Sequence, residues 1–434
     1  MFPEFDETAR GKGALYGIPG LTLFSEPTSG YCRGSTVMGG TAYFVYGGQL
    51  YQVLSNGTAG ALGAVGGTGP VSIANNGTQM LIVNGSQGYV YTTGTGMANI
   101  VDADFLASYT CDYISGYFIV AGVGSGTWAV SELDDAMSWN ALNRGVAESS
   151  PDGIVAIKKF NGEVHILGEN SREVWYNAAN PTANPFSPNQ GAQIDRGCIA
   201  RYSVATDMNA IYWLGDDLVV YAASQYTPTP ISNNAINFDI ANTANPEDAI
   251  GFTFNDQGHY YYVLSFPDGK TWVYDITTKL WHRRQSYGID RWRAVWPVFA
   301  YGKTLFGDYL DNVIGEQDYD TFTEYGDYLK WERTCQPITQ GNNLIFMDRF
   351  EIVMESGTGP NITNPVVYLE YSTDGGRTFC DPIAANYGMA GHYRWRTFWT
   401  ALGSGENFTM RIWGSDAFRR NIVDASISFD VGAP

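Results

Sequence analysis

The chain has 434 residues, which is enough for one large all-β domain or for two domains. Its 44 acidic and 25 basic residues give a formal net charge of −19, and no run of Lys and Arg forms a basic face, which argues against tight nucleic-acid binding. Apolar residues make up 44% of the chain, which excludes disorder through low hydrophobicity, and 51 Gly with 29 Tyr is typical of many short strands joined by tight turns.

The N-terminal residues, from Met1 to Asp6, contain no basic region followed by an apolar one, so we expect no secretion signal. No window approaches the roughly 18 uninterrupted apolar residues of a membrane span, so we expect a soluble protein made in a cytoplasm. The cysteines are odd in number, widely spaced and without a CxxC pair, which predicts buried free thiols and neither a zinc site nor a disulfide framework. They are Cys32, Cys111, Cys198, Cys335 and Cys380.

Short strand-like runs separated by turn dipeptides begin near residue 42. Residues 42–46 and 49–54 flank Gly47-Gly48, which predicts a hairpin. Similar pairs follow at 71–74 with 79–83, 154–160 with 163–167, 210–214 with 218–221, 258–264 with 271–275, and 294–300 with 303–308. Because the pairs recur at roughly blade-sized spacing, they predict a β-propeller of about five to seven blades, with a long β-sandwich as the alternative.

Helical periodicity is almost absent. We expect a helical turn or two within residues 131–144 and another around residues 247–249.

Two kinds of segment are candidates for contact with a partner. The Asn-rich stretches 177–181 and 233–237 are expected to be inter-blade loops, either solvated or touching another subunit. The tryptophan pairs Trp292/Trp296 and Trp395/Trp399 are interface anchors or core residues.

The pattern changes within the acidic, turn-rich stretch 318–327, beyond which the expected strands are longer. These later strands are residues 344–355, 366–371, 408–413 and 422–429. We therefore predict an all-β fold with an N-terminal extended segment (1–25), a β-propeller (26–324) and a C-terminal antiparallel β domain (325–434).

Residues 372–379 have the form of an Asp-box, S-x-D-x-G-x-T-F, and the matching residues are Ser372, Asp374, Gly376, Thr378 and Phe379. We expect Asp374 to accept hydrogen bonds from the turn backbone, a glycine of the box to take a positive φ, and Phe379 to pack under the hairpin. Glycan-active propellers such as sialidases carry repeated Asp-boxes. Since the box occurs once here, we interpret it as a structural hairpin staple.

Glycoside hydrolysis would need two carboxylates, or a Tyr nucleophile with an arginine cluster. Asp102, Asp104, Asp134 and Asp135 are candidates, but acidic residues are abundant, and we expect Asp134-Asp135 to form a solvated turn.

The histidines show no metal-ligand spacing, and we expect His165 to be a hydrogen-bonded core or interface residue. No nucleophile, phosphate-loop or zinc-protease motif is present. The sequence therefore predicts no catalytic residue, cofactor or metal, with Ca²⁺ held by loop carboxylates as the open alternative. The four histidines are His165, His259, His282 and His392.

Segments spread over nearly the whole chain resemble, in order, the packaged-DNA stabilisation proteins (head-completion or tail-nozzle proteins) of short-tailed bacteriophages. The most particular is the run Glu148-Ser149-Ser150-Pro151-Asp152-Gly153. One departure is that Phe2-Pro3-Glu4 stands at the very start of this sequence. In family members a short strand-like segment usually precedes the corresponding element. The segments are 14–21 with Arg33-Gly34 and 43–51, 147–154 with 171–176, 194–198 with 210–215, and the Asp-box with Leu402-Gly403, 410–412 and Ser415-Asp416.

This resemblance implies a structural virion protein of the tail, assembled in the host cytoplasm, and not an enzyme. Six copies would form a ring below the portal and adaptor proteins, extend and close the DNA exit channel, bind a tail needle or plug, and carry tailspikes or fibres. Double-stranded DNA would pass without sequence-specific binding, and an acidic wall suits such a conduit because repulsion keeps the polyanion mobile. The alternatives are a glycan-binding or glycan-degrading propeller for receptor recognition, and a bacterial or prophage scaffold propeller.

Overall fold

The computed structural model describes residues 2–5, 13–147, 152–180, 183–358 and 364–432, so Glu148–Pro151 of the family-like run, and Pro181, lie outside the described residues. The chain divides into two compact units. The propeller unit comprises Leu23–Gln285 and Ile289–Glu316, and the sandwich unit comprises Met1–Thr22, Ser286–Gly288 and Gln317–Pro434.

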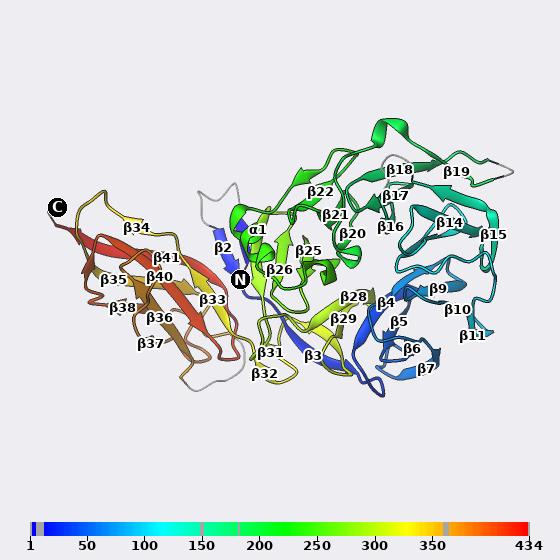
Figure 1. Ribbon diagram of the computed structural model, residues 1–434. Helices are drawn as coiled ribbons and strands as arrows, with labels where there is room; N and C mark the ends of the chain where they lie inside the picture. Colours follow the sequence, from blue (N-terminus) through cyan, green and yellow to red (C-terminus); the bar gives the residue numbers. More distant parts are fainter. Residues whose placement is uncertain (1, 6–12, 148–151, 181–182, 359–363, 433–434) are drawn as a thin grey trace. The chain divides into compact units, whose positions relative to one another are not determined.

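The propeller unit contains seven blades among the described residues; six are four-stranded antiparallel sheets, and four strands of a larger sheet form the seventh (Figure 1). Each blade runs from an innermost to an outermost strand in chain order, except that the N-terminal strand β3 supplies the outer strand of the seventh. Innermost strands of neighbouring blades contact one another, except that η2 (Arg201–Ser203) contacts β16 between blades four and five, and β28 contacts β4, which closes the ring. The bounds for blades one to four are β4 (Cys32–Met38), β5 (Thr41–Tyr46), β6 (Gln49–Val53), β7 (Ala59–Ala64); β8 (Ser72–Asn75), β9 (Gln79–Val83), β10 (Gly88–Thr92), β11 (Gly96–Asn99); β12 (Cys111–Ile114), β13 (Tyr117–Ala121), β14 (Thr127–Glu132), β15 (Asp135–Val146); β16 (Ile154–Phe160), β17 (Glu163–Gly168), β18 (Arg172–Asn177), β19 (Phe186–Pro188). Those for blades five to seven are β20 (Ala205–Thr206), β21 (Ile211–Leu214), β22 (Val220–Ala223), β23 (Thr229–Pro230); β24 (Ile250–Asp256), β25 (His259–Ser265), β26 (Thr271–Asp275), β27 (Leu280–Arg284); β28 (Ala294–Ala300), β29 (Lys303–Asp308), β30 (Ile314–Asp318), β3 (Gly20–Ser25).

Turn chemistry explains why the hairpins form where the sequence predicted them. Asn161 (φ 51°) and Gly162 (φ 78°) join β16 to β17, and both are residue types that accept the left-handed conformation of a two-residue hairpin turn. Before β9, the Asn76 side-chain oxygen accepts hydrogen bonds from the amides of Thr78 (3.0 Å) and Gln79 (2.7 Å). The predicted hairpins, and a blade number within the predicted range, are confirmed.

The core of the propeller unit lies between neighbouring blades. Blades three and four enclose Trp128, whose ring meets that of Trp175 edge to face at 5.2 Å. Arg33, 1% exposed, donates from its guanidinium to four backbone oxygens, those of Gly69 (2.6 Å), Gly47 (2.8 Å), Gly66 (2.9 Å) and Val65 (3.0 Å). Apolar packing and buried polar anchoring thus act together around the ring.

Ring closure is fastened by side chains of the first and seventh blades. The Ser35 hydroxyl donates to the Trp296 carbonyl oxygen (2.7 Å), and the Asp308 amide donates to the Tyr46 hydroxyl (3.0 Å). These bonds join residues near opposite ends of the propeller sequence.

The sandwich unit places two sheets around one apolar core. The N-terminal hairpin joins this unit, because Leu15 pairs with Ile422 at the edge of the second sheet. Buried Ile352, Leu369 and Met410 come from three different strands of the core. The first sheet contains β33 (Trp331–Thr334), β34 (Ile338–Thr339), β40 (Asn407–Gly414), β36 (Val366–Ser372) and β37 (Ile383–Asn386); the second contains β1 (Phe2–Phe5), β2 (Gly13–Tyr16), β41 (Ile422–Val431), β35 (Ile345–Met354), β38 (Thr397–Thr400) and β39 (Ser404–Gly405).

A short connection, β31 (Thr323–Glu324) and β32 (Asp327–Tyr328), precedes the first sandwich strand, and Leu21 pairs with Glu324. The all-β class with a C-terminal antiparallel domain is confirmed. The exact division into 1–25, 26–324 and 325–434 stays a prediction.

Three local expectations are wrong. Residues 131–144 form the end of β14, a turn at Asp134 (φ 54°) and β15, because cross-strand pairing outweighs the weak helical pattern. The stretch 233–237 begins a helix, α1 (Asn234–Ala241), in which the Asn233 side chain caps the amides of Ala235 and Ile236. The loop at 177–180 lies within blade four, between β18 and β19, and not between blades.

Three short 3-10 turns complete the described structure: η1 (Gln190–Ala192), η2 (Arg201–Ser203) and η3 (Pro246–Asp248), the last at the helical turn expected near residue 247. Across the described ranges, every helix is too short or too polar to cross a bilayer.

Candidate functional site

The Asp-box forms the turn after β36. The Ser372 hydroxyl donates to Asp374 Oδ1 (2.6 Å) and accepts from the Gly376 amide (2.9 Å). Thr378 donates to the same carboxylate from its amide (3.0 Å to Oδ1) and its hydroxyl (2.6 Å to Oδ2). Hydrogen bonds from the hydroxyls of Ser372 and Thr378, then from the Thr378 amide, hold the pKa of Asp374 well below its ordinary value.

The remaining Asp-box residues complete a compact turn. Gly375 (φ 79°) and Gly376 (φ 85°) take the left-handed conformation. Phe379 is half-buried, and the Arg411 guanidinium carbon lies 3.8 Å from its ring centroid. The carboxylate is saturated by its own turn, which favours a structural role; that role stays a prediction.

The first two candidate carboxylates form hydrogen bonds or ion pairs with neighbouring protein groups. Asp102 accepts from the amides of Trp139 and Asp104 (both 2.9 Å), and these two bonds, in that order, lower its pKa. Asp104 lies 3.7 Å from the Arg144 guanidinium. Asp102 therefore anchors β15 to the loop before blade three.

The second two candidates belong to the hairpin joining β14 and β15. Asp134 is exposed in the turn, as expected, and accepts from the Tyr113 hydroxyl. Asp135 accepts from the Met137 amide (3.0 Å) and from the Gln79 side chain (3.4 Å). These contacts fix a turn, and the structure gives neither carboxylate a catalytic partner among the described residues.

His165 differs from expectation in one respect. It lies in the core, 1% exposed and edge to face with Phe160 at 5.6 Å, but neither ring nitrogen has a hydrogen-bond partner among the described residues. Burial, and then the nearby Arg172 charge, lower its pKa to about 3, so the imidazole is neutral at physiological pH.

The other histidines contact unrelated groups. His259 Nδ1 lies 2.9 Å from Asp275 Oδ2, His282 meets the Tyr261 ring, and His392 stacks on an exposed tryptophan. In the described part of the chain, no three His, Cys, Asp or Glu side chains gather as metal ligands would.

The cysteines are free thiols. Cys32, Cys111 and Cys198 are buried, as expected, and burial raises the pKa of Cys111 and of Cys198 to about 12. Cys335 is exposed and Cys380 is half-buried, so the expectation of burial is wrong for Cys335.

The tryptophan pairs split between core and surface. Trp292 (3% exposed) and Trp399 (4%) are core residues, whereas Trp395 is 40% exposed. The half-buried Trp296 faces the propeller axis, where its ring meets Tyr202 edge to face at 6.4 Å.

The densest basic stretch of the sequence, residues 282–293, does not form a continuous basic surface, because only one of its four arginines, Arg283, is exposed. Arg284, Arg291 and Arg293 are all buried, at 3%, 6% and 9% exposure. The Arg293 guanidinium pairs with Asp308 and, at 2.7 Å, with Asp311. These buried arginines therefore make their contacts inside the propeller unit and not at a nucleic-acid-binding surface.

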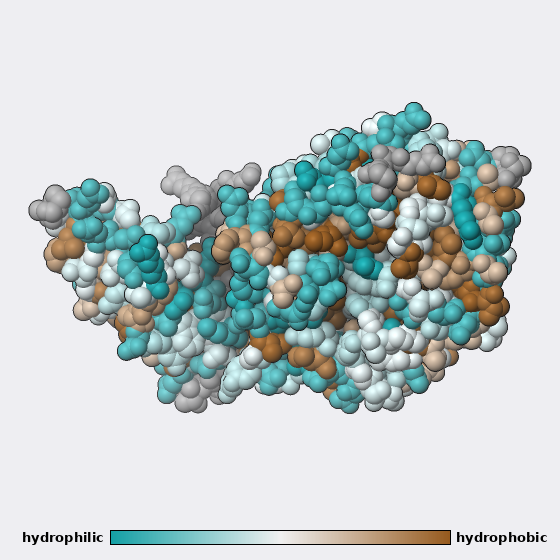
Figure 2. All heavy atoms as spheres, in the orientation of Figure 1, coloured by the Kyte–Doolittle hydropathy of each residue, from teal (hydrophilic) through white to brown (hydrophobic). Residues whose placement is uncertain are grey.

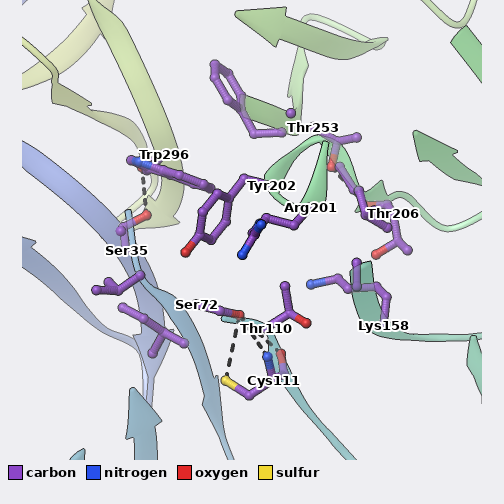
Figure 3. Close-up of a pocket in the computed structure, with 18 of the residues that line it drawn as sticks. Ser35, Ser72, Thr110, Cys111, Lys158, Arg201, Tyr202, Thr206, Thr253 and Trp296 are labelled. Carbon is purple, nitrogen blue, oxygen red and sulfur yellow. Dashed lines mark hydrogen bonds between the residues drawn. The ribbon is translucent and has the colours of Figure 1, made fainter. Parts of the chain in front are cut away.

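A cavity of about 220 Å³ lies on the propeller axis (Figure 3). The innermost strand of every blade contributes to its wall, and η2 supplies Arg201 and Tyr202. The Tyr202 hydroxyl donates to the Pro70 carbonyl oxygen (3.0 Å), which fixes η2 against the second blade. The wall includes Ser35, Ser72, Cys111, Ile157, Thr206, Thr253 and Trp296.

Gly251 in β24 makes room for η2. A Cβ atom at this position would lie well under 3.0 Å from the Ser203 carbonyl oxygen. Sequence reasoning missed this cavity because its residues are short runs of two or three from each of seven blades, and no contiguous motif brings them together.

Comparison with family models gives two matches in chain order. A family described as "Bacteriophage P22 Gp10, beta-propeller" matches residues 1–322, and one described as "Bacteriophage P22 Gp10, beta-sandwich" matches residues 330–430. A search of curated proteins finds no match to the sequence.

Two solved structures show distant likeness. The computationally designed Ika8 protein has 12% identity and a TM-score of 0.43, with 73% of this chain and 95% of that chain covered. PorZ, an essential bacterial surface component of the type-IX secretion system of Porphyromonas gingivalis, has 11% identity and a TM-score of 0.39, with 71% and 38% covered. Neither likeness bears on function.

Proposed function

We propose a specific role for this chain on the premise that it belongs to the bacteriophage P22 Gp10 family, whose two models cover residues 1–322 and 330–430. The chain is thus a phage structural protein of the type that stabilises packaged DNA, and a virion component that assembles with other phage proteins. Our proposal is that it forms the tail nozzle. Six copies form a ring below the portal and adaptor, extend the DNA exit channel, bind a needle or plug, and carry tailspikes or fibres.

The observation that carries the proposal is the ordered match to both domain types of one phage structural family. The charge distribution supports it, because the chain carries a net −19 and three of the four arginines in its densest basic stretch are buried. An acidic wall repels DNA phosphates and lets the duplex slide.

We assign subunit contact to the outer edge of blade three. The register of β15 against β14 jumps between Trp139 and Arg144, so residues 140–143 bulge away from the sheet. Leu142 on this bulge is 70% exposed, and Val101 and Leu133 are 89% and 61% exposed. Hydrophobic residues gather at this end of the propeller unit in the region of β15 (Figure 2). A ring requires a heterologous interface of this kind, and exposed apolar side chains supply its buried area.

We further propose that the protein is not an enzyme. The candidate carboxylates Asp102, Asp134 and Asp135 accept hydrogen bonds from backbone and side-chain donors within the propeller unit, which leaves the glycan-degrading alternative without a supporting site. Purified protein incubated with host surface polysaccharide should release no reducing ends. Turnover that a single carboxylate substitution abolishes would overturn this part of the proposal.

The test of the nozzle role is a phage that lacks this gene product. Such a phage should assemble capsids that fill and then lose their DNA, and the protein supplied in trans should restore filled, infective particles. Supplying Leu142→Lys should restore fewer particles than Leu142→Met, because only the charged side chain disrupts an apolar contact. Particles that stay filled and infective without the protein would contradict the proposal.

A further inference from the structure

The axial cavity of the propeller has the chemistry of an anion site. Among the described residues that line it, two carry positive charge, Arg201 and Lys158, and none is acidic. Figure 3 shows both cationic side chains directed toward the middle of the cavity, with Thr110 beside them. In a chain with a net charge of −19, such a cationic cavity requires an explanation.

Arg201 is held in place by its aromatic neighbour. Its guanidinium carbon lies 4.0 Å from the Tyr109 ring centroid, and in the described part of the chain it forms no ion pair. Because the guanidinium stacks through its face, its N–H groups remain available at its edge. The 3-10 turn that carries Arg201 is fixed by the Tyr202 contact to Pro70 and by the close approach at Gly251.

Lys158 retains net positive charge although it has a partner. Its ammonium lies 3.4 Å from Asp112, and the same carboxylate lies 4.0 Å from the Lys159 ammonium. Two lysines thus share one carboxylate, which leaves one positive charge beside that of Arg201. The Asp112 carboxylate also accepts a hydrogen bond from the Lys159 amide at 3.1 Å, which holds the carboxylate beside the backbone of β16.

Thr110 adds a neutral donor. It is 7% exposed, and its hydroxyl oxygen accepts a hydrogen bond from the Ile157 amide at 3.1 Å. The hydroxyl proton is then free to donate in another direction. Guanidinium, ammonium and hydroxyl donors around one space form the donor set that oxygen anions prefer.

We infer that the axial cavity binds a small oxyanion, either free phosphate or sulfate or a carboxylate group. A cavity needs only about 10–15 Å³ of such volume to hold one water molecule, so 220 Å³ accommodates an anion of several heavy atoms with its hydration. The anion bridges β16 of blade four and η2 before blade five, so its binding stabilises the ring. This inference does not depend on the nozzle role.

The experiment is a titration of the purified full-length chain with sodium phosphate, and in parallel with sodium acetate, against sodium chloride of equal ionic strength. The thermal midpoint should rise with phosphate beyond the chloride control, because a ligand that binds the folded state stabilises it. An acetate response of equal size would assign the site to carboxylates, whereas a response to phosphate alone would assign it to tetrahedral oxyanions.

Matched variants locate the effect. Lys158→Gln and Arg201→Gln should each weaken phosphate binding about tenfold or more, because each removes one of two charges at the anion. Lys279→Gln is the control, since this exposed lysine in the turn between β26 and β27 is not part of the cavity wall. It should bind phosphate as the wild type does.

Phosphate binding should also be followed by calorimetry at a temperature where each variant is folded. If Arg201→Gln does not fold, the pair Lys158→Gln and Lys279→Gln still decides the matter. No response to either anion beyond chloride, or equal responses in these two lysine variants, would overturn the inference.

Discussion

The propeller and the sandwich use buried polar side chains to different extents. In the propeller, Arg33 is 1% exposed and ties four backbone oxygens together, so a buried cation anchors the first blade to the segment that leads into the second. In the sandwich unit, the buried Arg420 (1% exposed) donates to one backbone oxygen, that of Phe322, and the carboxylate of Asp374 is saturated at an exposed turn. The difference teaches that one buried cation of the propeller joins several backbone segments, whereas the buried Arg420 of the sandwich unit binds a single carbonyl oxygen among the described residues.

The largest expected effect is the loss of a propeller anchor. Arg33→Met should lower the free energy of unfolding of the propeller unit by on the order of 3 kcal/mol, because several buried carbonyl oxygens lose their donor. Chemical denaturation with peptide-resolved hydrogen exchange measures the loss and assigns it to a unit.

The control is Arg196→Met, which removes a half-exposed arginine that pairs with Asp217 at 2.9 Å, and it should cost less than about 1 kcal/mol. Equal losses in the two variants would contradict the idea of an internal anchor.

The next effect tests the close approach on the propeller axis. Gly251→Ala places a methyl group against the Ser203 carbonyl oxygen and should cost about 2 kcal/mol, with faster hydrogen exchange in residues 200–206. Gly60→Ala is the matched control, because nothing lies within 4 Å of its Cβ position. If the Gly251→Ala variant keeps wild-type stability and native hydrogen exchange in η2, the close packing between Gly251 and Ser203 is contradicted.

A smaller effect concerns pH. The pKa of His165 is lowered from 6.5 to about 3, so the unfolded chain binds the proton more readily, and stability is lost as the pH falls below 6.5. At pH 5.5 this loss is about 1 kcal/mol. His165→Leu should therefore narrow the fall in thermal midpoint between pH 7 and pH 5.5.

The control for this prediction is His392→Leu, at an exposed position of the sandwich unit, which should keep the wild-type pH profile. A His165→Leu profile parallel to that of the wild type would exclude the buried imidazole as the cause.

The smallest effect concerns the sandwich turn. The pKa of Asp374 is held below its ordinary 3.8, so its contribution to stability is present above that pH and is lost as the pH falls further. Asp374→Asn should lower the thermal midpoint of the sandwich unit slightly at pH 7. At low pH the midpoint of the variant should lie closer to that of the wild type. Asp381→Asn, at an exposed position just beyond the box, is the control and should have no such effect. A propeller unit destabilised by Asp374→Asn would break the contrast between the units.

Local chemistry explains which features the sequence predicted. Asn161-Gly162 and the Asp-box are contiguous, and their turns follow from neighbouring residues, so the hairpins were predictable. The helix at 234–241 was missed because only Ile236 and Ile240 are buried, too few to give a clear helical pattern. The strand β15 was mistaken for helical turns because its bulge interrupts the alternation of buried and exposed residues.

The axial cavity was beyond sequence reasoning for a different reason. Arg201 and Lys158 approach one another only after the blades close into a ring, and neither residue belongs to a motif. The family-like segments, in contrast, keep their order along the chain, and both family models confirm that resemblance.

Cryo-electron microscopy of the complete virion tail tests the central claim most directly. The nozzle role predicts a six-fold ring of seven-bladed propellers between the adaptor and the needle, with the outer edge of blade three in contact with the neighbouring subunit. Density for this chain on a peripheral spike, or its absence from the virion, would contradict the account.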